Sequence, residues 1–275
     1  MIAVRRAGNR RVLAGLVLLV ALVALVLGGP LAAPSPWDEV DVTAFHQGPS
    51  ARHWLGTTQG GRDVFALTLR GARTSMLAGA EVAVVATGLA AVVGAVAGYA
   101  GGRVDRVLML GTDLLLVLPS FLVVAVLAPR LPGGPPVLMA VVAALMWMVT
   151  ARAVRAMTLS LRRRGHVLAA RTAGVSAPRI VVRHVLPHLA SLLAVDASLN
   201  VGLAIAAESG LSYLGFGVRP PEVSLGTLIA DGQADAAAHP WPFGFAAGLL
   251  VLVVLAVNLL GDGLRDAFAP DGGGR

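Results

Sequence analysis

Residues 162–188 read RRRGHVLAARTAGVSAPRIVVRHVLPH and lie between two long apolar runs. The pair Ala169-Ala170 predicts a short helix, Gly174 permits a sharp turn after it, and Pro187 is expected to end a second helix. We therefore expect a compact helix-turn-helix on one face of a membrane. A polar, structured segment of this kind indicates a docking surface for a partner rather than an active site.

The rest of the chain is strongly apolar. Its 275 residues are 56% hydrophobic and 13% charged, with a mean hydropathy of +0.78, whereas soluble domains use about 45–50% apolar residues. Little sequence remains for a separate globular core. Cysteine is absent, which excludes disulfides, a thiol nucleophile and cysteine-based metal sites.

The charge pattern also points to a membrane. The net charge is +7 without a single lysine, and the arginines gather at the ends of apolar runs. This is the distribution that the positive-inside rule describes, and no basic face with interleaved aromatic residues indicates nucleic-acid binding.

Six apolar stretches are near or above the length of about 20 residues that crosses a bilayer. They cover about residues 12–33, 75–99, 107–127, 137–157, 189–214 and 243–260. The short Pro/Gly turn at 129–136 makes the third and fourth spans antiparallel neighbours. The sequence thus predicts an all-α bundle of six transmembrane helices, with a membrane anchor and outer loop in residues 1–73 and a five-helix core in residues 74–275.

Arginines assign the two sides of the membrane. Four precede the first span, and the densest basic segment follows the fourth, in the loop 158–188. The positive-inside rule places this loop and both termini in the cytoplasm, and the loops 34–73 and 215–242 outside.

The first span has an alternative interpretation as a cleaved signal peptide, because Leu31-Ala32-Ala33 resembles a cleavage site after a basic start. The unbroken apolar run from Val12 to Leu27 is slightly longer than the usual apolar region of such a peptide. We therefore expect a permanent anchor.

Ionisable side chains inside spans are costly, so each needs an explanation. Asp113 and Glu208 are expected to pair with arginine or backbone groups near an interface. A water-filled translocation path is the alternative, in which a carboxylate meets a peptide amine or a cation. The candidates for such a path are Glu81, Asp196, Asn200 and Glu208.

Other functions find little support. The six histidines are scattered over loops, and their spacing does not predict a metal site: His46, His53, His166, His184, His188 and His239. Neither Gly-x-Ser-x-Gly nor His-Glu-x-x-His occurs, which argues against an intramembrane enzyme. We expect no catalytic residue, cofactor or metal. A passive channel would need a filter, usually formed by repeated copies.

Several segments carry a family resemblance. The chain resembles the membrane subunits of binding-protein-dependent ABC importers, and more narrowly those of the dipeptide/oligopeptide/nickel group. Their so-called EAA loop is matched by Ala169-Ala170, Gly174 and Leu186-Pro187. Further matching segments follow in the family's order, namely 55–57, 61–63, 71–75, 183–187, 208–215, 220–221 and 258–266.

The match has departures in the same loop. Leu168 stands where the family has the acidic residue, and His166 where it usually has tyrosine. The first change removes a charge that an ATPase partner would normally meet.

The resemblance implies a type I importer permease with the MetI-like fold. A cytoplasmic coupling helix within about residues 165–177 would enter an ATPase groove, with Ala169, Ala170, Gly174, Leu186 and Pro187 as the coupling residues. The implied partners are a second homologous permease, two cytoplasmic ABC ATPase subunits and an external substrate-binding protein at a bacterial plasma membrane.

ATP hydrolysis is expected in the partners, because a chain without lysine has no phosphate-binding loop ending in Lys-Ser/Thr. Di- or oligopeptides are the expected cargo. Nickel or another small solute, and a non-ABC channel, are the alternatives.

Overall fold

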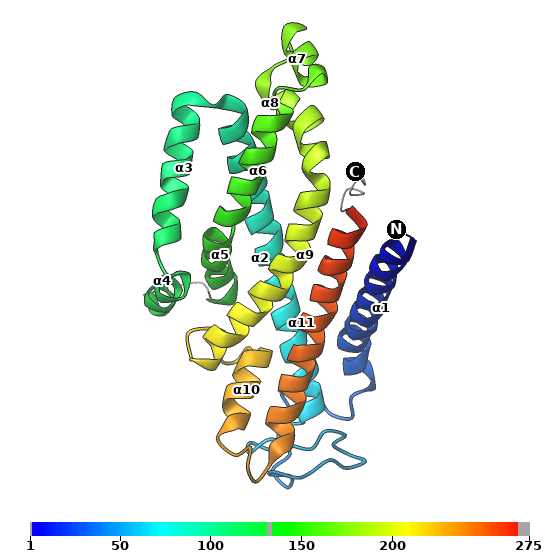
Figure 1. The fold of residues 1–275 in the computed structure, drawn as a ribbon. Coiled ribbons are helices and arrows are strands. Elements are labelled where there is room, and N and C mark those ends of the chain that lie inside the picture. Colours follow the sequence, from blue (N-terminus) through cyan, green and yellow to red (C-terminus); the bar gives the residue numbers. More distant parts are fainter. Residues whose placement is uncertain (1, 131–133, 269–275) are drawn as a thin grey trace.

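The computed structural model describes residues 2–130 and 134–268, and within them every regular element is helical (Figure 1). Four helical segments are long and apolar enough to cross a membrane singly, and two bent helix pairs bring the total to six if each pair is one span. The predicted all-α membrane fold is confirmed. The single segments are α1 (Ile2–Ala32), α2 (Val64–Ala100), the run Ala177–Tyr213 and α11 (Pro240–Phe268).

The third and fourth spans are bent rather than straight. In the third, α3 (Gly102–Val117) meets α4 (Ser120–Leu127) and the 3-10 turn η1 (Ala128–Arg130) at 77°. The cause is Pro119, which lacks an amide hydrogen and holds the preceding Leu118 in an extended conformation.

The fourth span consists of α5 (Gly134–Met146) and α6 (Met148–Leu161), which meet at 44°. The predicted turn at 129–136 that leads into it includes residues 131–133, which lie outside the described part of the chain.

Two boundaries differ from the sequence prediction. Helix α2 begins at Val64 instead of about Ser75, because the Asp63 side chain caps it by accepting a 2.9 Å hydrogen bond from Ala66 N–H. The expected division after residue 73 therefore falls inside α2. The predicted outer loop 215–242 contains a further helix, α10 (Leu225–Gln233), which starts with a capping box between Ser224 and Thr227.

Helix α2 lies at the centre of the bundle and contacts most of the other helices. Small residues line its buried faces, and at Gly94 an added Cβ would lie 2.5 Å from Ala151 O and 2.7 Å from Val154 Cβ of α6. Glycine there lets the two backbones approach closely, as is common between membrane helices.

Helix α1 is an integral part of the bundle. It runs beside α11 (Figure 1), and its Leu22 and Val26 are buried against neighbouring helices. Arg11 near its start forms a 3.2 Å ion pair with Asp266 near the end of α11. This packing favours the expected membrane anchor.

The helix expected to stop at Pro187 instead continues. Helices α8 (Ala177–Ile180) and α9 (Leu186–Tyr213) are joined by the π-helical turn η2 (Val181–Val185), and Pro187 lies in the first turn of α9. A proline is tolerated in this first turn because it has no N–H to leave unsatisfied, and the preceding turn follows the wider π pattern, in which Leu186 N–H bonds to Val181 O.

Candidate coupling surface and polar sites within the bundle

Helix α7 (Gly165–Thr172) projects beyond the bundle at one end (Figure 1). It ends in a Schellman motif, in which Val175 N–H bonds to Ala170 O and Gly174 N–H bonds to Arg171 O, each at 3.1 Å. Gly174 adopts a φ of 77°, the left-handed region that glycine tolerates. The predicted turn is therefore present at the predicted glycine.

The surface of α7 is mostly free of intramolecular contacts. Val167 is buried and anchors the helix, whereas Ala169 and Gly174 are exposed, Ala170 is half-buried and Leu168 is 47% exposed. A short projecting helix with small exposed residues and one exposed leucine suits insertion into a groove of a partner.

The other two predicted coupling residues lie at the base of this projection. Leu186 packs against a buried cluster that includes Ala95 of α2 and Val154 of α6, and Pro187 is exposed. His166 of α7 stacks on His188 of α9, with ring centroids 5.0 Å apart at 14°. The ring stacking, which the spacing of the histidines did not predict, connects α7 directly to the start of α9.

Arginine pairs connect α6 to its neighbours between the middle of the bundle and the α7 end. Arg152 and Arg155 of α6 bind Asp113 and Asp105 of α3, so the arginine pairing expected for Asp113 is confirmed. Arg162 Nη1 donates a 3.0 Å hydrogen bond to Tyr99 O at the end of α2.

A polar junction joins three helices in the middle of the bundle. Asp196 of α9 accepts hydrogen bonds from Thr87 of α2 (2.9 Å), Thr150 of α6 and Asn200 of α9 (2.8 Å). Two predicted path residues, Asp196 and Asn200, are thus adjacent. The sequence does not indicate the roles of the two threonines, because a threonine in an apolar run gives no local signal of its partner.

Glu208 forms a second polar group and is completely buried. Its carboxylate accepts hydrogen bonds from Ser75 Oγ (2.8 Å), Ser212 Oγ (2.6 Å) and Ser209 Oγ (3.4 Å). The expected pairing with arginine or backbone is therefore wrong within the described residues, since hydroxyl groups take that place.

The same hydroxyls connect Glu208 to other segments. Ser75 Oγ accepts the N–H of Leu225 (3.2 Å) at the start of α10, and Ser212 Oγ accepts the N–H of Val218 (3.0 Å). Glu208 thereby fixes the positions of α2, α9 and α10. The fourth candidate, Glu81, is exposed on α2 and is not brought to these groups.

Replacing Glu208 with alanine is expected to destabilise the chain by about 2 kcal/mol, because buried hydroxyls lose their acceptor. Thermal unfolding of the purified chain in detergent measures the effect. Glu81→Ala, which removes an exposed carboxylate from the same bundle, should leave the melting temperature nearly unchanged. Equal losses in the two variants would contradict the assigned role of Glu208.

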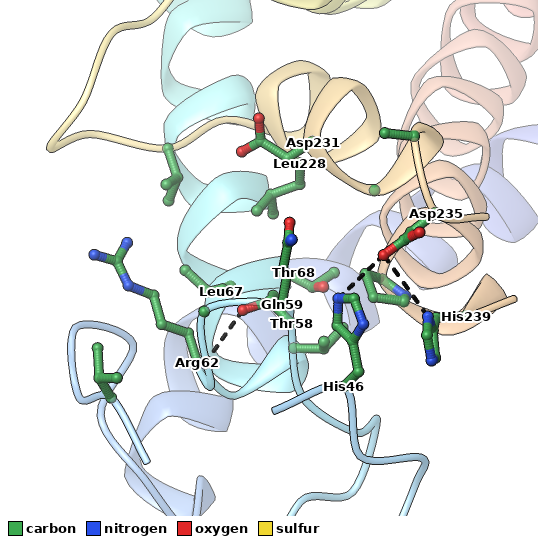
Figure 2. A pocket seen from close by; sticks show the side chains of 17 residues that line it. His46, Thr58, Gln59, Arg62, Leu67, Thr68, Leu228, Asp231, Asp235 and His239 are labelled. Carbon is green, nitrogen blue, oxygen red and sulfur yellow. Dashed lines mark hydrogen bonds and ion pairs between the residues drawn. The ribbon is translucent and has the colours of Figure 1, made fainter. Parts of the chain in front are cut away.

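The opposite end of the bundle contains a cavity of about 580 Å³. It lies between the outer segment 33–63, the start of α2, α10 and the start of α11 (Figure 2). Polar side chains from these segments line it, namely His46, Thr58, Gln59, Arg62, Thr68, Asp231, Asp235 and His239.

Asp41 orders the outer segment near this cavity. Hydrogen bonds from the Thr43 hydroxyl (2.6 Å) and Thr43 N–H (2.9 Å), together with the nearby Arg52 guanidinium, lower the pKa of Asp41 below its usual value.

Asp41→Asn should therefore reduce stability at neutral pH, where the wild-type carboxylate is charged. The pKa of Asp41 is lower in the folded chain than its unfolded value near 3.8, so the charged carboxylate stabilises the folded chain above that pH. This stabilisation is lost as the pH falls through the lower pKa of the folded chain. The melting temperatures of the two proteins should accordingly converge on acidification. A difference that is constant across the pH range would refute this.

Comparison with known proteins agrees with these features. Residues 90–271, about two thirds of the chain, match the family described as "Binding-protein-dependent transport system inner membrane component". The oligopeptide transport system permease proteins OppC of Mycobacterium tuberculosis and Mycobacterium bovis are each 51% identical to this chain over 264 residues, 95% of this chain and 91% of theirs.

OppC of Bacillus subtilis is 34% identical over 262 residues, 95% of this chain and 86% of that protein. Because the matches extend over most of the bundle and include α7, the resemblance noted in the sequence is confirmed. The chain belongs to the family of inner-membrane components of binding-protein-dependent transport systems, as a multi-pass permease of the ABC importer class.

Proposed function

We propose that this chain is the permease subunit of an ATP-driven importer of di- or oligopeptides, and that α7 receives the movement of a cytoplasmic ATPase subunit. The observation that carries the proposal is the placement of α7. It projects from the bundle with a free surface, and it leads directly into the continuous helical run Ala177–Tyr213 through the core (Figure 1). Relatives named oligopeptide permeases support the cargo.

The same end of the molecule is proposed to face the cytoplasm. The start of α1 and the end of α11 lie on the same half of the bundle as α7, although short of it (Figure 1), and Arg11 and Asp266 form an ion pair there. The end is rich in arginine, as the positive-inside rule requires, with Arg103, Arg106, Arg162, Arg163, Arg164, Arg171, Arg179 and Arg183. The cavity end would then face the external substrate-binding protein.

A second permease subunit is proposed to cover one side of α2. This central helix still exposes Leu77 (61%), Val84 (73%) and Val92 (60%). Glu81 lies on the same exposed side, where contact with lipid would be costly for a carboxylate. An interface with the second subunit, with a hydrated path along it, would keep the Glu81 carboxylate in contact with water instead of lipid.

Along this path we place Glu81 and the junction of Asp196 with Asn200, because Asp196 is half-exposed within this single chain. Glu208 has no exposed surface, and its role in the proposal is to hold the helices that border the path.

The test is uptake by vesicles that contain this chain with its partner subunits and binding protein. Radiolabelled tripeptide should accumulate only with ATP, and omission of this chain should abolish accumulation. Accumulation of nickel in place of peptide would identify the alternative cargo. Peptide flux that needs no ATP would contradict the importer and favour a channel.

A further inference from the structure

His46, Asp235 and His239 meet at the mouth of the cavity described above. Figure 2 shows Asp235 between the two histidines. His46 Nε2 is 3.4 Å and His239 Nδ1 is 3.8 Å from Asp235 Oδ2, and the two imidazole rings have centroids 4.1 Å apart. One ligand atom from each residue lies within 4.8 Å of the others.

These separations fit one metal ion. A tetrahedral Zn²⁺ with ligands at about 2.0–2.1 Å holds them about 3.3 Å from one another. The two distances to Asp235 Oδ2 are 3.4 and 3.8 Å, and all three ligand atoms lie within 4.8 Å of one another, so a bound ion would draw the histidine side chains slightly closer. Two imidazoles and one carboxylate suit Zn²⁺ and similar divalent transition metals better than Mg²⁺ or Ca²⁺, which prefer oxygen ligands.

Two further observations indicate a prepared site. Among the described residues, the buried His239 Nδ1 has no hydrogen-bond partner, although a buried ring nitrogen normally has one. His46 has a φ of 51°, a left-handed conformation that is uncommon for a residue with a side chain. Hydrogen bonds hold both backbones, from His46 N–H to Thr58 O and from His239 N–H to Asp235 O.

We propose that His46, Asp235 and His239 bind a divalent transition-metal ion, with Zn²⁺ as the best-fitting case and a fourth position open to water. The ion would connect the outer segment 33–63 to the junction of α10 and α11, beside the cavity. This site is independent of the cargo and of the coupling helix. It accounts for the approach of His46 to Asp235 and His239, which lie far further along the chain, although the polar contacts among these three described side chains are only the two ion pairs.

The test uses the full chain with a histidine-free affinity tag, purified in detergent and stripped with a chelator. Calorimetric titration with Zn²⁺ should give one ion per chain, and the melting temperature should rise by about 5 °C in saturating Zn²⁺. His46→Gln and His239→Gln should each weaken Zn²⁺ binding by more than about tenfold and remove the thermal shift.

His166→Gln is the matched control, because it removes a histidine from the other histidine group, at the α7 end. It should retain full Zn²⁺ affinity. Unchanged affinity in both His46→Gln and His239→Gln, or the absence of wild-type binding up to about 1 mM Zn²⁺, would overturn the proposal.

A second measurement needs no variant. The side chain of Arg52 in the outer segment is 74% exposed and offers a trypsin site. Zn²⁺ should slow cleavage there in the wild-type chain, whereas Mg²⁺ should not. Equal cleavage rates with Zn²⁺ and with Mg²⁺ would contradict the proposal that the ion connects the outer segment to the junction of α10 and α11.

Discussion

Replacing Gly94 with leucine is expected to separate α2 from α6 and to cost more than about 3 kcal/mol of stability. A Cβ at this position already lies 2.5 Å from a carbonyl oxygen of α6, and backbone atoms cannot yield as a flexible side chain does. The melting temperature of the purified chain should fall by about 10 °C or more. Gly94→Ala should show the same defect to a smaller degree.

The matched control is Gly88→Leu in the same helix. An added Cβ at Gly88 meets no described atom within 4 Å, so this change adds the same apolar side chain without a clash. It should leave the melting temperature close to that of the wild type. If the two leucine variants behave alike, the close α2–α6 packing does not control stability at Gly94.

The second large effect is expected at α7, the proposed coupling helix. Ala170→Arg should reduce ATP-driven uptake by about 100-fold, because a bulky charge in a closely packed interface costs about 2–4 kcal/mol and each 1.4 kcal/mol is a factor of ten. The half-buried Ala170 lies at the end of α7 and accepts the Schellman bond from Val175. The measurement is ATP-driven uptake into vesicles by the variant relative to the wild type, corrected for the amount of inserted chain.

Val104→Arg is its control. It adds the same charge at the same end of the molecule, in the first turn of α3 beside Arg103, at an exposed position away from α7. This variant should insert normally and keep most of the uptake. Normal uptake by Ala170→Arg would remove α7 from the coupling pathway.

Leucine at position 168 allows a related comparison. Its side chain is 47% exposed on α7, at the place where the family has an acidic residue. If this chain and its ATPase have adapted to one another, Leu168→Glu should not increase uptake. An increase would indicate that the partner still carries the complementary positive charge.

The sequence was most informative where signals are local. Six apolar stretches predicted the spans, because about 20 apolar residues have few other uses. Gly174 and the alanines before it predicted α7 and its turn. The structure departs from the sequence prediction at three local features, namely the Asp63 cap, the bend at Pro119 and the capping box at Ser224.

Long-range contacts could not be predicted in this way. Thr87 and Thr150 meet Asp196 only after three helices have packed, and His46 meets His239 only when the outer segment folds against the start of α11. Pro187 shows a different limit. A proline usually ends a helix, but a π-helical turn before it removes the conflict, and sequence alone does not reveal that turn.

The continuous helical run Ala177–Tyr213 follows α7 and would act as a lever if it moves as one body. Its 37 residues measure about 55 Å at about 1.5 Å per residue. The Asp196 junction lies near the midpoint, so the helix could pivot about it. A tilt of about 5° around that point would displace each end by about 2 Å in opposite directions, given the rise per residue. A push on α7 would therefore reach Glu208 and α10 at the far end with its direction reversed.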